Sequence, residues 1–181
     1  AFGFTCVVNG DDLRSLCPGE VDAFAGMDEG ALFVDHTTVS PTVTRELAAV
    51  AAAQGLRYVD APISGGQAGA ENGILTVMCG GAQADFDEAF PVIDAYARKC
   101  MLIGPVGAGQ QTKMLNQICI AGLVQGLSEA VALGQALELD MKAVLDVISG
   151  GAAQSWQMEN RGKTMVADEL EFGVAVDWRR K

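Results

Sequence analysis

The sequence predicts an α/β domain followed by an all-α domain, on three observations. Through roughly the first hundred residues, short runs rich in Val, Ile, Phe and Leu alternate with helix-forming runs, a pattern typical of parallel α/β structure. A glycine-rich segment, GPVGAG at 104–109, then interrupts the chain. After it, apolar and small residues recur at three- and four-residue spacing and no strand pattern returns. The expected domains are therefore 1–106 and 107–181.

Short apolar runs in the first domain are expected to be strands, at 4–8, 31–35, 57–59, 74–79 and 100–103. A helix is expected between the second and third runs. Ser40 has the side chain of an N-cap, Pro41 suits the first helical position, and Gly55 suits the helix end. A further helix is expected from Asp85 to Arg98, with Pro91 as a kink or a break.

The second domain is expected to begin with one long helix from about Gly109. Three glycines and an alanine fall four residues apart on one ridge of that helix, at 122, 126, 130 and 134. Such a ridge lets another helix approach closely, which predicts that the long helix is central to its domain. Shorter helices are expected at 140–148 and 156–167.

Charge and composition exclude several classes of partner. Asp and Glu number 23 against 12 Lys and Arg, so the formal net charge is −11, and the basic residues cluster only at 179–181. Nucleic acid is therefore not an expected partner. A membrane is not expected either, because the most apolar stretch, Ile118 to Leu127, is short and interrupted by Gln125. With His36 as the single histidine, no metal site is expected.

The five cysteines are an odd number without a C-x-x-C pair, and most have apolar neighbours. This usage favours reduced thiols of the core type. With no visible signal peptide or transit sequence, the expected location is the cytoplasm.

The segment DAPISGGQAGAENG at 60–73 is rich in glycine around one serine. Ser64, Gly65 and Gly66 offer consecutive backbone N–H groups and a hydroxyl that no side chain blocks, which suits carboxylate or phosphate oxygens. The same three residues are also typical of a turn that joins two strands. The residues alone leave both interpretations open.

Lys113 begins the long apolar helix, and Asn116 follows three residues later on the same face. Lys113 is either a side chain that extends to solvent near a helix end or a general acid/base with Asn116 as its orienting partner. A third polar segment, DHTTVSP at 35–41, follows a strand at the edge where open α/β sheets bind ligands. There Thr38 and Ser40 either cap the next helix or contact a cofactor, and His36 is expected to be structural.

Two segments in this order, DAPISGGQAGAENG at 60–73 and GPVGAGQQTKMLNQ at 104–117, closely resemble motifs of the β-hydroxyacid dehydrogenases. This family includes 3-hydroxyisobutyrate dehydrogenase and semialdehyde reductases, and it is related to 6-phosphogluconate dehydrogenase. The resemblance covers nearly the whole chain, with DHTTVSP at 35–41 and FGVAVDWRRK at 172–181 included. It implies the C-terminal portion of a Rossmann-type NAD(P)-binding domain, followed by an all-α domain that opens with a long interdomain helix.

The resemblance also implies roles for individual residues. Ser64, Gly65 and Gly66 would bind the substrate carboxylate, Lys113 would be the catalytic acid/base, and Asn116 would hold substrate and lysine in register. The cofactor, NAD or NADP, would contact Val7, Val8, Asp12, Thr38 and Lys181. The implied reaction is hydride transfer between this cofactor and a small β-hydroxy acid or its semialdehyde. The long helix would make a homodimer or homotetramer.

The sequence departs from the family in two respects. Gln117 stands where the family commonly has a second asparagine. The family's first βαβ unit, with its G-x-G-x-x-G turn, and its terminal helices are not in the sequence, so both domains are expected to be incomplete parts of a longer enzyme. The alternative to a dehydrogenase is a non-catalytic, dehydrogenase-like module for oligomerisation or partner binding, or an inactive fragment.

Overall fold

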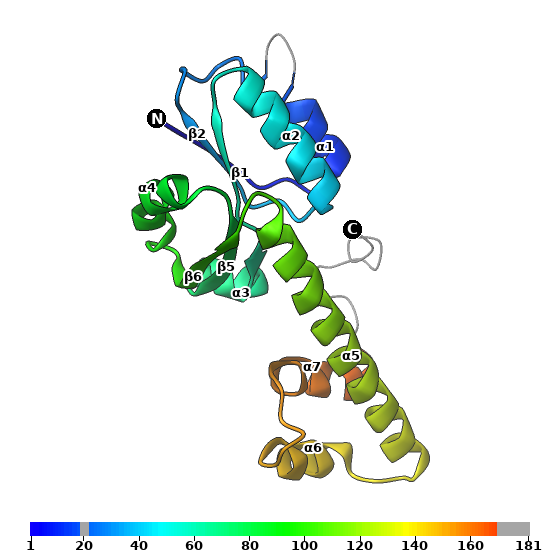
Figure 1. Cartoon of the computed structure of the whole chain (residues 1–181). Helices are drawn as coiled ribbons and strands as arrows, with labels where there is room; N and C mark the ends of the chain where they lie inside the picture. The colour runs from blue at the N-terminus through cyan, green and yellow to red at the C-terminus, as the bar shows by residue number, and fades with distance from the viewer. Residues whose placement is uncertain (19–21, 170–181) are drawn as a thin grey trace. The chain divides into compact units, whose positions relative to one another are not determined.

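The structure, a computed structural model, describes residues 1–18 and 22–169 (Figure 1). Its strands are β1 (Phe2–Thr5), β2 (Leu32–Asp35), β3 (Arg57–Asp60), β4 (Ile63–Ser64), β5 (Leu75–Gly80) and β6 (Ala97–Gly104). Its helices are α1 (Gly10–Leu16), α2 (Pro41–Ala53), α3 (Gly66–Glu71), α4 (Gln83–Ile93), α5 (Ala108–Ala136), α6 (Met141–Ser149) and α7 (Trp156–Val166). The described residues pack as two units, 1–115 (the sheet unit) and 116–169 (the helical unit).

The strands of the sheet unit run in the order β1-β2-β3-β5-β4, with β6 beside β5. Strands β1, β2 and β3 are parallel to one another, and so are β5 and β6. However, β5 is antiparallel to β3, which it meets at one pair, Asp60 and Gly80, and it is antiparallel to β4. The sheet is therefore mixed: the expected parallel α/β pattern is present, and the antiparallel pairings of β5 with β3 and β4 were not anticipated. The cause is that the chain passes from β3 through Ala61 and Pro62 into β4 and then returns as β5.

Each face of the sheet is covered by helices, because successive residues of a strand point to opposite faces. Phe33 and Tyr58 pack with Leu13 of α1 and Leu47 of α2. On the other face, buried side chains of the same strands pack with helix α4; they are Leu32, Val34, Val59, Ala89 and Ile93. Figure 1 shows α1 and α2 together on their side of β1 and β2. The sheet unit thus has the layered α/β architecture that the sequence predicts.

Local signals explain most elements, but several were missed or misplaced, and β4 and α3 were not predicted. Helix α2 begins after Ser40, whose hydroxyl accepts the N–H of Val43, as expected. Helix α1 was not predicted, although Asn9 caps it by accepting two backbone N–H groups. The first strand lies two residues before its expected start, at Phe2–Thr5. Helix α4 continues through Pro91 and ends at Ile93, because the following residues form β6.

The helical unit has one cluster of buried apolar side chains, contributed by α5, α6 and α7; its members are Leu127, Val131, Met141, Leu145 and Met158. On the predicted small-residue ridge, Gly134 lies directly against the Met141 side chain. A Cβ atom at Gly122 or Gly126 would meet nothing within 4 Å. Among the described residues, the predicted close approach of another helix is therefore seen only at the far end of the ridge.

Helix α5 is longer and more exposed than the apolar stretch 118–127 indicated. An 18-residue window of this helix has a mean hydropathy of 1.3, and 17% of the window is buried. By length and composition alone, α5 is long enough to cross a membrane. The shortness of the stretch 118–127 therefore does not exclude a membrane, and the absence of a membrane partner stays a prediction.

Candidate active site

Three buried polar side chains form a row across the carboxyl ends of the parallel strands. The strand register pairs Thr5 with Asp35 and Asp35 with Asp60, so the three lie side by side on β1, β2 and β3. All three are buried, and the two aspartates are fully so. Ligands of open α/β sheets bind outside this edge, so the row marks where a site would be built.

Asp35 organises the loop that follows β2. Its carboxylate accepts the N–H of Thr37 at 2.9 Å and the hydroxyl of Tyr58 at 2.9 Å. Burial raises the pKa of Asp35, and the hydrogen bonds from Thr37 and Tyr58 counteract part of that rise. The Thr37 hydroxyl in turn accepts the N–H of Val7 at 3.1 Å. The segments after β1 and β2 are thereby tied together at the sheet edge.

Asp60 holds the beginning of helix α5. Its carboxylate accepts the N–H of Gly107 at 2.7 Å and the N–H of Gln110 at 2.9 Å. The approach is close, because a Cβ atom at Gly80 would lie 2.8 Å from the Gly109 nitrogen. Burial raises the pKa of Asp60 to about 6, although both backbone hydrogen bonds favour the carboxylate. The start of α5 is consequently fixed against the ends of β3 and β5.

Gln110 makes the second link between α5 and the sheet edge. It is fully buried. Its side-chain amide accepts the N–H of Val39 at 3.1 Å and donates to the carbonyl of Thr37 at 2.7 Å. Neither Gln110 nor Asp60 was predicted from the sequence as a site residue. The available signal was a polar side chain directly after a glycine-rich break, at the start of an apolar helix.

Lys113 lies on α5 three residues after Gln110 and is half-buried. Burial lowers the pKa of its ammonium group, which is the direction that an acid/base role requires. Within residues 1–18 and 22–169, no hydrogen bond or ion pair to Lys113 is present. Asn116 follows on the same helix, and its side-chain amide donates to Gln117 at 3.0 Å.

Ser64, Gly65 and Gly66 form the passage from β4 into α3. Gly65 and Gly66 have φ angles of 135° and 63°, which glycine adopts without strain and other residues rarely do. A Cβ atom at Gly66 would meet nothing within 4 Å, so the backbone there is open to approach. Ser64 is half-buried, and no described residue hydrogen-bonds its hydroxyl or joins it to Lys113.

The residues expected to contact the cofactor are partly brought together. Val7 and Thr38 are half-buried beside the tied loops, and Val8 is 49% exposed. These residues follow the carboxyl ends of β1 and β2, and their contact with a cofactor stays a prediction. Asp12 is exposed in the first turn of α1, where its N–H bonds to Asn9. Lys181 lies outside the described residues.

His36 has a structural environment, in agreement with its expected role. Its Nδ1 lies 2.6 Å from the carbonyl oxygen of Ala61, and its Nε2 lies 2.8 Å from the hydroxyl of Tyr96. Burial lowers the pKa of His36, so the neutral ring donates to Ala61 and accepts from Tyr96. In the described part of the chain, no group of three or more His, Cys, Asp or Glu side chains is arranged to hold a metal ion.

The cysteines agree only in part with core-type thiols. None of the five forms a disulfide. Cys17 and Cys79 are buried as expected, whereas Cys6 and Cys119 are exposed and Cys100 is half-buried. The expectation was therefore wrong for Cys6, which follows β1, and for Cys119, which lies on α5, because both side chains are exposed despite their apolar neighbours.

Two family models match consecutive parts of the chain. The model described as the NAD-binding domain of 6-phosphogluconate dehydrogenase matches residues 2–104. The model described as the NAD-binding domain of NADP-dependent 3-hydroxyisobutyrate dehydrogenase matches residues 107–181. This chain belongs to the β-hydroxyacid dehydrogenase family. Both models describe NAD-binding domains, so the cofactor of the family is NAD or NADP.

Similar proteins extend beyond this chain. An uncharacterized oxidoreductase of Shewanella frigidimarina is 59% identical over 98% of the chain and 61% of its own length. A 2-(hydroxymethyl)glutarate dehydrogenase of Eubacterium barkeri is 32% identical over 98% of the chain and 60% of its own length. The solved structure of a 3-hydroxyisobutyrate dehydrogenase from Salmonella typhimurium has a TM-score of 0.88 at 31% identity, over 98% of this chain and 62% of that one. The chain therefore spans about three fifths of these β-hydroxyacid dehydrogenase relatives.

Proposed function

We propose that this chain carries the acid/base half of an NAD(P)-dependent dehydrogenase that acts on a small β-hydroxy acid or its semialdehyde. The observation that carries the proposal is the half-buried Lys113, placed on a helix start that Asp60 and Gln110 hold against the sheet edge. The family assignment and the relatives named as hydroxyacid dehydrogenases support the reaction class.

Lys113 would move the proton of the reacting oxygen. In the oxidative direction its neutral amine accepts the proton of the substrate hydroxyl, and in the reductive direction its ammonium donates a proton to the carbonyl oxygen. Burial lowers the pKa of Lys113, which makes the neutral amine more accessible near neutral pH. The hydrogen bonds of Asp60 and Gln110 to the start of α5 fix where this amine is presented.

The substrate carboxylate would bind to the open backbone at 64–66. Gly66 has open space around its Cα, although a Leu75 methyl group lies close to Gly65, and the Ser64 hydroxyl adds a further donor. Asn116, one helical turn after Lys113, would hydrogen-bond the substrate and fix it relative to the amine. These roles would suit a small substrate with one carboxylate near its reacting carbon.

The segments after β1 and β2 would hold the nicotinamide end of the cofactor. Val7, Val8 and Thr38 lie there, with Asp12 on the following helix. Hydride transfer at the carbinol carbon is the chemistry that NAD or NADP supplies when bound. Lys181 would be a further contact.

The experiment is turnover of NAD(P) with a panel of β-hydroxy acids and semialdehydes, followed by the absorbance of the reduced nicotinamide. Lys113→Ala is expected to lower kcat by about 10²- to 10⁴-fold, the usual contribution of a general acid/base, with little change in cofactor affinity. Lys99→Ala, which removes an exposed lysine of the same unit, is the matched control and should retain turnover. Equal turnover in wild type and Lys113→Ala would contradict the proposal, whereas no turnover with any compound would favour the alternative of an inactive fragment.

A second readout does not depend on turnover. Reductive methylation with a ¹³C reagent gives each lysine its own NMR signal, and assignment uses the Lys113→Ala spectrum. The pKa of Lys113 is expected to be lower in the folded chain than in the urea-unfolded chain, because burial disfavours the charged form. A signal that titrates as in the unfolded chain would remove the physical basis of the acid/base role.

We also propose that the helical unit assembles into a homodimer or homotetramer. Its apolar side chains Ile118, Leu133 and Val147 are 68%, 62% and 72% exposed in the single chain. Exposed apolar surface of this kind is typical of association sites. Leu133→Glu and Val147→Glu are expected to reduce the sedimentation coefficient to that of a monomer. Ile103→Glu, in the sheet unit, is the control and should leave the assembly unchanged; a monomeric wild type would contradict the proposal.

A further inference from the structure

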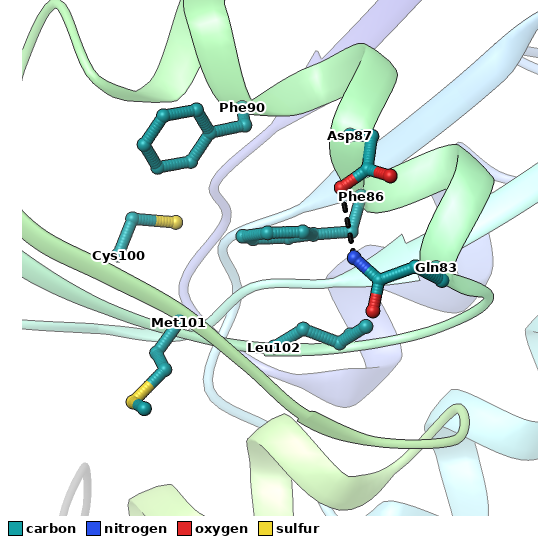
Figure 2. Close-up of a pocket in the computed structure, with 7 residues that line it drawn as sticks. All are labelled: Gln83, Phe86, Asp87, Phe90, Cys100, Met101 and Leu102. Atoms are coloured by element: carbon teal, nitrogen blue, oxygen red, sulfur yellow. Dashed lines mark hydrogen bonds between the residues drawn. The ribbon is translucent and has the colours of Figure 1, made fainter.

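A pocket of about 460 Å³ lies between helix α4 and strand β6 (Figure 2). Side chains of α4 form one wall and residues of β6 the other; the lining is Gln83, Phe86, Asp87, Phe90, Cys100, Met101 and Leu102. None of these residues belongs to the candidate active site. Figure 2 shows the sulfur of Cys100 pointing toward the two phenylalanine rings, with Leu102 below Phe86.

The Cys100 sulfur has a second thiol beside it. The Sγ atoms of Cys79 and Cys100 are 3.6 Å apart. Cys79 is fully buried in β5, whereas Cys100 is half-buried and lines the pocket. Reagents in solution therefore reach the pair through Cys100.

The register of the two strands disfavours a disulfide between these thiols. Cys79 pairs with Leu102, and Val77 pairs with Cys100, so the cysteines are two residues out of register on parallel strands. With strands about 4.8 Å apart and a rise of about 3.3 Å per residue, their Cα atoms are about 8 Å apart. Disulfides rarely join Cα atoms more than about 7 Å apart. The pair is therefore expected to stay as two thiols.

The two thiols have different acidities. The hydrogen bond from Cys79 lowers the pKa of Cys100, against the opposing effects of burial and the Asp94 charge, and the N–H of Met101 lowers it further. The same hydrogen bond, together with burial, raises the pKa of Cys79. This hydrogen bond favours a thiolate at Cys100, whose sulfur lines the pocket.

The pocket walls discriminate between reagents. Phe86, Phe90 and Leu102 present apolar surface to whatever approaches Cys100. Asp87 stands at the rim, where its carboxylate accepts a hydrogen bond from Gln83 at 2.8 Å, and Asp94 lies near the thiol. With a net charge of −11 on the chain, these carboxylates disfavour anionic reagents. A neutral organic molecule with an apolar body fits both the walls and the charge.

We propose that Cys100 is a covalent modification site for neutral α,β-unsaturated carbonyl compounds that occupy the pocket between α4 and β6. The Cys100 sulfur adds to the β-carbon of the compound, and a C–S bond forms as the C=C π bond breaks. The displaced electron pair forms an enolate, which takes a proton from water at the α-carbon. Nothing is oxidised or reduced, so the step needs no further reactant.

The first experiment compares labelling rates of individual cysteines in the intact chain by peptide mass spectrometry. The probes are N-phenylmaleimide and N-(4-carboxyphenyl)maleimide, which share the reactive group and differ in one negative charge. Cys100 is expected to react with N-phenylmaleimide about ten times faster than the exposed Cys119, since its thiolate is stabilised. The advantage should shrink with the carboxylated probe. Equal rates at Cys100 and Cys119 would overturn the proposal.

The second experiment separates the thiol pair from the pocket. Cys79→Ala removes the donor and is expected to slow labelling of Cys100, whereas Cys79→Ser keeps a donor and should preserve most of the rate. Phe90→Ala removes one wall, so it should slow N-phenylmaleimide and leave the small N-methylmaleimide unchanged. Circular dichroism confirms that each variant is folded. Rates at Cys100 that are unaffected by Cys79→Ala and by Phe90→Ala would overturn the role of the pair and the pocket.

Discussion

The sheet unit buries its apolar side chains on both faces, whereas the helical unit leaves many of its own exposed. In the sheet unit, Phe33 and Val34 of one strand are both buried, because helices cover both sides. In the helical unit, Leu133 and Val147 are more than half exposed, while Leu145 of the same unit is buried. The two units differ because helices cover both faces of the sheet, whereas α5, α6 and α7 cover only one face of one another. Both units leave some large apolar side chains exposed, but the sheet unit has two large buried clusters and the helical unit has one small one.

The largest effect that tests this comparison comes from the sheet core. Phe33 is 2% exposed and packs edge-on against Phe24, with ring centroids 4.9 Å apart. Phe33→Ala is expected to lower the free energy of unfolding by about 3–5 kcal/mol, because it removes buried apolar surface and leaves a cavity. The measurement is urea unfolding followed by circular dichroism. Leu133→Ala, at 62% exposure, is the matched control in the helical unit and should cost far less at monomeric concentration; equal losses would refute the contrast.

A smaller effect concerns Asp60, which ties the sheet to the helix start. Its pKa is about 6 in the folded chain, against about 3.9 in an unfolded one. Between these pH values the folded state holds a proton that the unfolded state lacks, so this group's contribution to stability falls as pH rises through that window, by about 2–3 kcal/mol. Asp60→Asn removes this dependence, although it also loses an acceptor for one backbone N–H.

The measurement is urea unfolding of wild type and Asp60→Asn at several pH values between roughly 4.5 and 7, with the difference in unfolding free energy plotted against pH. The lowered pKa of His36 acts in the opposite sense, since stability is lost as pH falls through its unfolded value. That contribution is common to both proteins and cancels in the difference. Wild type should lose stability relative to Asp60→Asn as pH rises, and a difference that does not change with pH would show that Asp60 is not held at a raised pKa.

The sequence predicted those elements whose signals are local. Helix α2 follows from Ser40 and Pro41, and strand β2 follows from a short apolar run. The antiparallel meeting of β3 and β5 could not be predicted, because it depends on one pair, Asp60 and Gly80, brought together by tertiary contacts. Gln110 was missed for the same reason, since it bonds Val39 across 71 residues of chain.

For the candidate site, the two sequence motifs indicated the region. The structure shows which hydrogen bonds hold that region in place. Lys113 and the segment 64–66 were named from the sequence and from the family resemblance, and their roles stay predictions. The hydrogen bonds that Asp60 and Gln110 make at the start of α5 could not be predicted from the sequence. Their side chains bond backbone N–H and carbonyl groups, which are the same for every residue type. The three helices of the helical unit were predicted to within about one residue of their observed starts, but the close approach expected at 122–126 was not found, because the ridge there faces nothing in the described residues.

The smallest effect compares one helix cap in each unit. Ser40 accepts the N–H of Val43 at 3.2 Å, and Ser155 accepts the N–H of Met158 at 3.1 Å, so the two caps are alike in position and geometry. Ser40→Ala and Ser155→Ala should each cost about 1 kcal/mol. Ser128→Ala is the control, because that hydroxyl donates to the Val124 carbonyl within its own helix and caps nothing.

Amide hydrogen exchange of the two cap variants decides whether the units unfold separately. If the sheet unit is stable through its own core, Ser40→Ala should speed exchange in the sheet unit alone, and Ser155→Ala should speed exchange in the helical unit alone. The helical unit should also exchange faster in wild type, since it buries fewer apolar side chains. If either variant accelerated exchange equally in both units, the chain would unfold as one. The small buried cluster of the helical unit would then limit the stability of the sheet unit as well.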